Sequence, residues 1–335
     1  MIPDRRYTRR VNLTDIARAC GVAPSTVSRA LNNPGRVSAE MHQRISQKAI
    51  EMGYASATLP QGPERRARGT IALVVPNLAN PFVHELVRGS QAQTQAAEYL
   101  FLLINTEDSV HVEMKWLREL TRTVDGIVLS SPRAGEAELR AIADAVPVTL
   151  INREVPGVSS VTIDTPTSSV EALRYLASLG HQRIAFVRGP ETSWASQERL
   201  AALEPAAAEA GVELLPIGAF HPSLTAGAAA ADAVALSGAS GALFFNDTLA
   251  IGAMTRFRQR GIRIPDDISV IGCDDIMAAE TSYPALTTIT GSGERIGRTA
   301  AELLINQFTA RAPRVRTERM AAHLTVRDST GPAAG

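Results

Sequence analysis

The sequence has little cysteine and few aromatic residues. Of 335 residues only Cys20 and Cys273 are cysteines, and 4% are Phe, Trp or Tyr. Two cysteines so far apart match no metal-ligand spacing, and we interpret both as small buried residues in a reducing compartment. The six histidines form no cluster, and His181 is expected to make a structural hydrogen bond. The sequence therefore predicts neither a metal site nor a bound cofactor.

Long apolar runs and the common catalytic motifs are also absent. No run is long enough to cross a bilayer, and the N-terminal MIPDRRYTRR is basic without the apolar core of a signal peptide. We therefore expect a cytoplasmic protein without a membrane span. The patterns GxSxG, GxGxxG and Walker A do not occur. An enzyme would need a nucleophile, a base or a metal set, and since none is evident we predict that the chain is not an enzyme.

Charge is balanced over the whole chain but not along it. Lys plus Arg and Asp plus Glu each number 34, whereas residues 1–70 hold 12 basic and 5 acidic side chains. The head is therefore net +7 and the rest of the chain net −7. A basic head on an acidic body is typical of a nucleic-acid-binding protein. The length and a hydrophobic content of 45% predict a globular protein of two or three domains.

The stretch LTDIARACGVAPSTVSRALN, residues 13–32, predicts two short helices joined by a tight turn at Gly21. Leu13 and Ile16 recur at helical spacing on the inner face of the first helix. The second helix begins at Pro24, which is tolerated because a first-turn N–H has no intrahelical partner. Its outer face carries short polar side chains and one arginine, which suit phosphates and guanine edges in a major groove. The alternative is an ordinary surface hairpin, but the basic charge of the head favours nucleic-acid binding.

The longer stretch LTDIARACGVAPSTVSRALNNPGRVSAEMHQRI closely resembles the DNA-binding headpiece of the LacI/GalR family of bacterial repressors. The resemblance implies an all-α helix-turn-helix headpiece over 1–54, with a third helix from Ser38 to about Met52. It makes double-stranded operator DNA the partner and places the second helix, 24–31, in the major groove. Base edges would be read by Pro24, Ser25 and Arg29. The positions that contact the DNA backbone fall on Thr14, Thr26, Ser28, Asn32 and Arg36.

Residues 55–70, ASATLPQGPERRARGT, depart from the family pattern. Relatives carry a short hinge helix here, with a leucine that inserts into the minor groove, but Pro60, Gly62 and Pro63 oppose a helix. Three interpretations stay open. Leu59 inserts from a shorter helix, or an irregular hinge attracts DNA through arginines, or the segment is a flexible solvated linker. The arginines concerned are Arg65, Arg66 and Arg68.

From residue 71 short apolar runs alternate with helical stretches. This alternation predicts parallel sheets covered by helices on both faces, and the length fits two such doubly wound units. The expected strands are 71–76, 99–105, 126–131, 148–152, 183–189, 214–218, 242–246 and 268–274. The expected helices are 82–98, 110–122, 196–210 and 248–260. Polar side chains follow many of these strands, and ligands in such folds bind beyond the carboxyl ends of strands.

The body, 71–335, resembles the periplasmic-binding-protein-like effector domain of the same family. The matching motifs are VVPNLANPF, LASLGHQRIAFVRGP, FFNDTLAIGAM, PDDISVIGCDD and YPALTTI. The resemblance implies an α/β body of two doubly wound lobes, about 71–163 plus 292–321 and about 164–291 plus 322–335. Three crossovers would join the lobes, and a small effector would bind between them. The implied effector contacts are Asn80, Phe82, Asn105, Ser130, Ser193, Trp194, Arg199, Phe220, Asn246 and Asp274.

Several of these side chains suit a sugar. Arg199 donates to sugar oxygens and Asp274 accepts from neighbouring hydroxyls, while Trp194 and Phe220 offer aromatic faces to a ring. Core packing is the alternative for Trp194, and helix capping is the alternative for Asp274. The family element that follows LTTI is replaced by residues 290–293, which suggests an altered or larger pocket.

These features together predict a homodimeric transcription factor, a repressor, whose sugar-like effector alters head spacing and so operator affinity. Dimerisation would use the body, through surface helices at 82–95 and 294–307. The protein would be cytoplasmic, and associated with the nucleoid when bound to its operator. A transport-type sugar-binding protein is the main alternative from another class, since it shares the body. It requires export, however, and has no use for the basic head.

Overall fold

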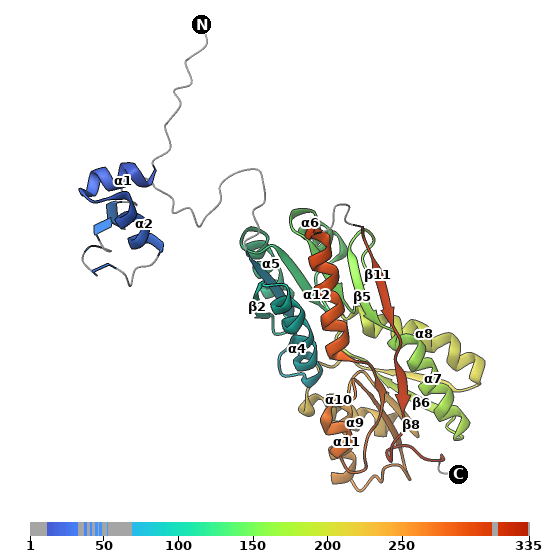
Figure 1. Cartoon of the computed structure of the whole chain (residues 1–335). Helices are drawn as coiled ribbons and strands as arrows, with labels where there is room; N and C mark the ends of the chain where they lie inside the picture. The colour runs from blue at the N-terminus through green and yellow to red at the C-terminus, as the bar shows by residue number, and fades with distance from the viewer. Residues whose placement is uncertain are drawn as a thin grey trace. The chain divides into compact units, whose positions relative to one another are not determined.

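The computed structural model describes residues 12–32, 37–38, 41, 44–45, 47–48, 52, 69–309 and 314–333. The chain divides into two compact units, 1–66 and 67–335 (Figure 1). Much of the expected third helix, 38–52, and nearly all of the linker, 55–70, lie outside the described residues. The three interpretations of the linker therefore stay predictions.

In the first unit, helices α1 (Leu13–Cys20) and α2 (Pro24–Asn32) form the predicted hairpin. A capping box starts α1, in which Asp15 N–H donates to the Asn12 side chain and Asn12 N–H donates to the Asp15 carboxylate, both at 3.0 Å. Gly21 ends the helix in the left-handed conformation, with φ 65°. A small apolar core holds the two helices together and consists of Ile16, Ala17, Cys20, Val27, Ala30 and Ile45.

The second unit contains two six-stranded sheets. The first has the order β11-β5-β4-β3-β1-β2, and all its pairings are parallel. Its strands are β1 (Thr70–Val75), β2 (Leu100–Asn105), β3 (Gly126–Ser130), β4 (Val148–Ile151), β5 (Ser159–Ile163) and β11 (Thr317–Met320). Its helices are α4 (Pro81–Ala96), α5 (Val110–Thr123), α6 (Glu136–Ala145) and α12 (Gly293–Thr309).

Helices cover both faces of this first sheet, as a doubly wound fold requires. Successive residues of β1 point to opposite faces. Ile71 and Leu73 pack in one apolar cluster with α4 and α12, and Ala72 and Val74 pack in another with α5 and α6. Helices α4 and α12 run side by side along one face (Figure 1).

The second sheet has the order β12-β10-β9-β8-β6-β7. Its strands are β6 (Arg183–Val187), β7 (Glu213–Ile217), β8 (Gly241–Phe244), β9 (Ser269–Cys273), β10 (Thr287–Thr290) and β12 (His323–Thr325). Its helices are α7 (Thr165–Ser178), α8 (Trp194–Ala210), α9 (Leu224–Ser237), α10 (Asp247–Gln259) and α11 (Met277–Thr281). Strand β12 pairs antiparallel with β10, so this sheet is not wholly parallel as expected. An antiparallel edge strand on an otherwise parallel sheet is common, because only the edge accepts a returning segment.

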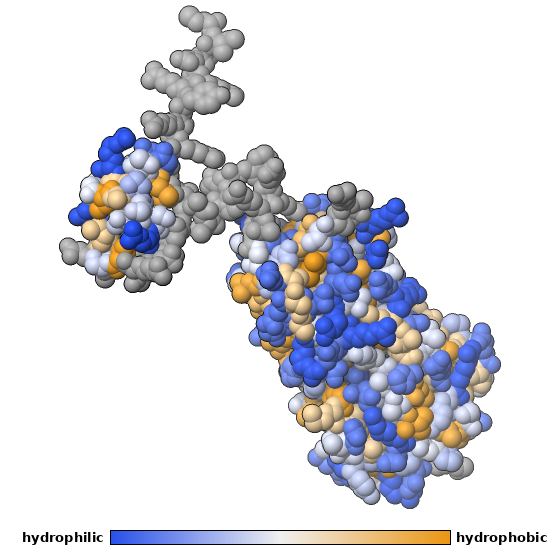
Figure 2. All heavy atoms as spheres, viewed as in Figure 1, coloured by the Kyte–Doolittle hydropathy of each residue, from blue (hydrophilic) through white to orange (hydrophobic). Residues whose placement is uncertain are grey.

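Three connections pass between the sheets, from β5 to α7, from β10 to α12 and from β11 to β12. Each sheet with its helices is therefore a lobe built from discontinuous parts of the chain. On the face shown in Figure 2, hydrophilic side chains predominate over the second unit and apolar ones are scattered. Among the described residues, every helix is too short or too polar to cross a bilayer.

Candidate functional site

Helix α2 presents an outer face of exposed and half-buried polar side chains. Pro24, Ser25 and Arg29 are exposed, while Val27 and Ala30 on its inner face are fully buried. Of the predicted backbone-contacting residues, Thr14 is exposed, and Thr26 and Ser28 are half-buried. The side chain of Asn32 and the whole of Arg36 lie outside the described residues.

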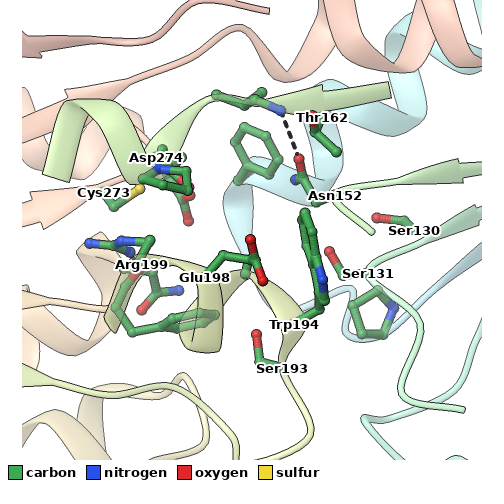
Figure 3. A pocket seen from close by; sticks show the side chains of 18 of the residues that line it. Ser130, Ser131, Asn152, Thr162, Ser193, Trp194, Glu198, Arg199, Cys273 and Asp274 are labelled. Atoms are coloured by element: carbon green, nitrogen blue, oxygen red, sulfur yellow. Dashed lines mark hydrogen bonds between the residues drawn. The ribbon is translucent and has the colours of Figure 1, made fainter. Parts of the chain in front are cut away.

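A cavity of about 420 Å³ lies between the two lobes. Its walls come from segments that follow the carboxyl ends of strands in both sheets, where parallel α/β folds bind ligands. Figure 3 shows the side chains that converge on it. Eight of the ten predicted effector contacts line this cavity, namely Asn80, Phe82, Ser130, Ser193, Trp194, Arg199, Asn246 and Asp274.

Asn105 and Phe220 do not line the cavity. The Asn105 side chain accepts from Leu78 N–H at 3.3 Å, and so holds the loop that carries Asn80. Phe220 packs against the apolar core of the second lobe beside Gly218. Asn105 ends β2 and Phe220 follows β7, but their side chains turn towards the protein rather than into the cavity.

Helix α8 and its N-cap bring several cavity residues together. Its N-cap, Ser193, accepts from Ser196 N–H at 3.3 Å, which fixes the start of the helix. Trp194 follows directly, is half-buried and lines the cavity, so it is not a core residue. Glu198 and Arg199 lie one turn later on the same wall.

Arg199 is buried, with 2% of its surface exposed, and its nitrogens bond to the protein. Nε donates to Ser169 Oγ at 2.8 Å, Nη1 to the Phe245 carbonyl at 2.7 Å and Nη2 to the Phe244 carbonyl at 3.2 Å. The guanidinium also lies over the Phe186 ring, 5.2 Å from its centre. Arg199 therefore ties α7 and α8 to the end of β8.

Asn246 offers the cavity a buried donor. Its side-chain oxygen caps α10 by accepting from Leu249 N–H at 3.1 Å. Its side-chain nitrogen has no hydrogen-bond partner among the described residues, although Asn246 is only 2% exposed. A buried amide without a partner is costly, which is typical of a group that bonds to a ligand.

Two carboxyls beside the cavity have raised pKa values. Burial raises the pKa of Asp274, the nearby Asp247 carboxylate raises it further, and Arg199 and the Asn80 amide act in the opposite direction. Burial also raises the pKa of Asp247 to about 6. Asp247 is fully buried and accepts from Ile276 N–H at 2.9 Å and from Thr288 Oγ1 at 2.6 Å. These bonds hold the segment that carries Asp274, whose φ of 118° is rare outside glycine.

Asp275, next in the chain, faces the crossovers rather than the cavity. It accepts from Arg327 at 2.7 Å and from Thr290 Oγ1 at 3.0 Å. Thr290 ends β10, just before the chain crosses to α12. The segment that carries Asp274 is therefore bonded directly to a crossover between the lobes.

Sequence reasoning missed several charged residues of the cavity wall. Arg133 pairs with Asp108 at 2.9 Å, and both side chains are almost fully buried. Behind them, the buried Glu113 accepts from the backbone N–H groups of Arg133 and Ala134 at 3.0 and 2.8 Å. Asp108 and Arg133 lie just beyond the carboxyl ends of β2 and β3, where ligands of parallel α/β folds bind, so their place in the sequence is a signal that could have found them. The other missed charged residues are Glu154, Glu198 and Arg319, whereas Asp164 was expected as a polar group at a strand end.

The geometry of the cavity suits the binding of a small molecule. Among the described residues, no group of His, Cys, Asp or Glu side chains is arranged to hold a metal ion. The cavity combines an aromatic ring, a free amide donor, hydroxyls and carboxylates. Such walls recognise a small polar molecule by hydrogen bonds and stacking.

Comparison with known proteins identifies both units. Residues 12–56 match the profile described as bacterial regulatory proteins, lacI family, and residues 173–330 match that of the periplasmic binding protein-like domain. The HTH-type transcriptional regulator DegA of Bacillus subtilis is 31% identical over 96% of this chain and 99% of its own. The chain belongs to the LacI family. It is a DNA-binding transcription regulator controlled by a small effector, and its relatives are regulators rather than enzymes.

Two further similarities bear on this LacI-family regulator. The HTH-type transcriptional repressor CytR of Escherichia coli is 29% identical over 95% of this chain and 96% of its own. Among solved structures, the transcriptional regulator CelR in complex with cellobiose has a TM-score of 0.71 and 28% identity. That match covers 96% of this chain and all of the other. The likeness therefore extends over the head as well as the body.

Proposed function

We propose that this regulator is a homodimeric repressor whose operator affinity is set by a sugar or sugar derivative bound between its lobes. The cavity carries the proposal, because eight side chains implied by the family resemblance meet in it. The similarity to CytR, a repressor, and to CelR, which was solved with cellobiose, supports the same function.

In this proposal α2 reads the operator. Arg29 pairs with a guanine, Ser25 contacts a neighbouring base edge, and Pro24 packs on a thymine methyl or shapes the helix. The other five predicted head residues bind phosphates and hold the helix in register. They are Thr14, Thr26, Ser28, Asn32 and Arg36.

The effector lies against Trp194 and bonds to the polar side chains around it. Asn246 donates its partnerless N–H groups to an effector oxygen, and Asp274 accepts from an effector donor. Arg199 supports the wall through its bonds to the protein. Because three crossovers join the lobes, an effector that binds one lobe arrangement better shifts the whole body towards it.

Dimerisation is proposed to use the first lobe. The predicted helices 82–95 and 294–307 lie within α4 and α12, which pack on each other and leave an outer face where Arg88 pairs with Glu294. The neighbouring edge strand β2 exposes Leu100 by 68% and Leu102 by 38%. Exposed apolar side chains on an open sheet edge are typical of a surface that another chain covers.

The chain has three parts in this proposal. The headpiece spans 1–54, the linker 55–70 and the effector-binding body 71–335. The regulator works in the cytoplasm, and at the nucleoid when it is bound to its operator.

Fluorescence anisotropy with the DNA upstream of the regulator's own gene and of its neighbours tests the proposal. The purified full chain is expected to bind one of these duplexes at least roughly a thousandfold more tightly than random DNA at matched salt. One sugar or sugar derivative should change that affinity. Equal binding to all duplexes, with and without sugars, would contradict the proposed function.

A further inference from the structure

The interlobe cavity carries more negative than positive charge. Five carboxylates and three guanidinium groups line it, and no lysine or histidine is among the described residues of its wall. The carboxylates belong to Asp108, Glu154, Asp164, Glu198 and Asp274, and the guanidinium groups to Arg133, Arg199 and Arg319. The formal excess is two negative charges.

The three arginines are already bound within the protein. Arg133 pairs with Asp108 at 2.9 Å, and Arg319 pairs with Glu154 at 2.9 Å. Arg199 donates from all three of its nitrogens to a hydroxyl and two carbonyls, and it is only 2% exposed. None of the three therefore presents a free guanidinium fork to an anionic ligand.

Three of the five carboxylates, Asp164, Glu198 and Asp274, form no ion pair with any residue in the described ranges. Asp164 caps α7 by accepting from Thr167 N–H at 3.3 Å, so its charge is offset by the helix N-terminus. Glu198 and Asp274, by contrast, cap no helix, and the arginines whose charges act on them, Arg319 and Arg199, are bonded elsewhere. Glu198 is therefore the charged carboxylate of this wall, and Asp274, whose pKa is raised by burial, adds its charge when a cation binds beside it.

Trp194 lies beside these two carboxylates. Trp194 and Glu198 are four residues apart on α8 and therefore share one face of the helix. In Figure 3 the Glu198 side chain points into the space between Trp194 and Asp274. An aromatic face flanked by carboxylates is a favourable site for a cation.

Helix N-termini attract anions, and their own caps offset part of this attraction. Helices α4, α8 and α10 begin at the cavity, but each is capped by its own side chain. The caps are Asn80, Ser193 and Asn246, and each accepts from a first-turn N–H. Those N–H groups are therefore not available to an anionic ligand.

We propose that the effector carries a protonated amine, which binds between Glu198 and Asp274 against the face of Trp194. An amino sugar or another aminated polyol has this chemistry, with hydroxyls left to bond to Asn246 and the serines of the wall. The inference rests on the proposed function, since it assumes that the effector occupies this cavity. A bound cation favours the ionised carboxylate, so binding of the amine should lower the raised pKa of Asp274.

Selective quenching of Trp194 fluorescence tests the proposal without knowledge of the effector. Trp116→Phe in the full chain leaves Trp194 as its single tryptophan. Caesium and iodide ions quench tryptophan at matched ionic strength, and each quenching constant is divided by that of free N-acetyltryptophanamide. We expect the normalised caesium constant to exceed the iodide constant by roughly twofold or more, because a negative cavity concentrates cations.

Two further variants show whether the carboxylates of the cavity cause the difference between caesium and iodide quenching. Glu198→Gln should lower the caesium-to-iodide ratio, whereas Glu204→Gln, on an exposed site of the same helix outside the cavity, should change it little. A normalised ratio at or below one in the parent protein would overturn the proposal. So would an equal effect of the two substitutions.

Calorimetry with matched sugars distinguishes this inference from the proposed function. Glucosamine, N-acetylglucosamine, glucose and glucose phosphate, and the corresponding galactose series, are titrated into the wild-type chain. We expect the tightest ligand to be an amine, and Glu198→Gln to weaken it by roughly tenfold.

A neutral or phosphorylated sugar that binds more tightly than every amine would overturn the amine proposal and leave the proposed function intact. Failure of every sugar to bind, in a chain that still selects its operator, would overturn the amine proposal together with the sugar assignment.

Discussion

Arg29 and Arg199 of this regulator act in different ways, because Arg29 is exposed and Arg199 is buried. Arg29 is exposed on the outer face of α2, where its five N–H donors are available to DNA. Arg199 has the same chemistry but is buried, and its nitrogens hold the wall of the cavity. Substitution of the first should therefore affect operator choice, and substitution of the second should affect the stability of the body.

Arg29→Ala is expected to weaken operator binding by about 1–3 kcal/mol and to relax the preference for one base pair. The reason is the loss of a bidentate contact with guanine O6 and N7. Anisotropy titrations on the operator and on its single-base variants measure both effects. Arg29→Lys is the matched control, because it keeps the charge and loses the fork. Equal weakening on every duplex would show that Arg29 contacts phosphate instead.

His181 forms structural hydrogen bonds in the second lobe, which confirms the role predicted for it. It is 2% exposed and bonds to Ser240 Oγ at 2.8 Å, to Ser269 Oγ at 3.0 Å and to the Gly331 carbonyl at 3.1 Å. It thus joins the C-terminal segment to the end of the second sheet. Burial lowers the pKa of His181, so the ring is neutral in the folded protein at neutral pH.

The lowered pKa of His181 predicts a loss of stability in acid. Below about pH 6.5 the unfolded chain binds this proton first, so the free energy of unfolding falls as pH falls towards the lower pKa of the folded state. His181→Phe should flatten this dependence. It should also cost roughly 1–3 kcal/mol at neutral pH, since buried hydroxyls lose their partner.

Urea denaturation between neutral pH and about pH 5 measures the effect of His181. The control is His111→Gln, at an exposed site, which should keep the wild-type pH dependence. An unchanged slope in His181→Phe would contradict the assignment.

At the scale of elements, each lobe contains a pair of helices in unusually close contact. In the first lobe a Cβ on Gly89 of α4 would overlap the backbone carbonyl of Glu294 in α12, and one on Gly297 would overlap that of Leu86. In the second lobe Gly227 of α9 and Gly252 of α10 meet the partner helix in the same way. Glycine sets the distance between the helices in both lobes, because any side chain would force them apart.

Gly89→Ala is therefore expected to destabilise the body by about 1–3 kcal/mol, despite the roughly 1 kcal/mol that alanine gains in helix propensity. Urea denaturation gives the free energy of unfolding. Gln91→Ala is the control, because Gln91 is exposed on the same helix and its substitution adds no clash. Equal stabilities of the two variants would show that α4 and α12 can separate at no cost.

At the scale of the whole molecule, regulation requires that the body bring two heads to two half-sites. The exposed leucines of β2 are the candidate contact, and lysine in their place should repel a second copy. Leu100→Lys with Leu102→Lys is expected to raise the dimer dissociation constant by roughly tenfold or more. Operator binding should weaken in parallel.

Sedimentation of the full chain over a range of concentrations measures this dissociation. Leu236→Lys is the control, since Leu236 is 85% exposed on α9 of the other lobe. A dimer that withstands the double substitution would show that another surface carries the contact.

Elements with a clear apolar pattern were predicted from the sequence, and less regular ones were missed. Strands β1, β3, β4 and β9 lie within one or two residues of the predicted bounds. Helix α9 was missed because its alanine-rich sequence, LTAGAAAADAVALS, shows no contrast between an apolar and a polar face. Strand β12 was missed because three residues at a sheet edge carry too little pattern to identify a strand.

The sequence by itself determined the kind of protein: a basic helix-turn-helix joined to an α/β body with polar groups at its strand ends. Those features are local, since helix caps, periodicity and charge depend on neighbours along the chain. Only the tertiary structure decided which polar groups face the cavity. Asn105 and Phe220 turn away from it, Arg199 is held by the protein, and Glu198 and Asp274 form no ion pair within the described part of the chain. The cavity wall joins segments far apart in the chain, so its charge balance depends on contacts that only folding creates.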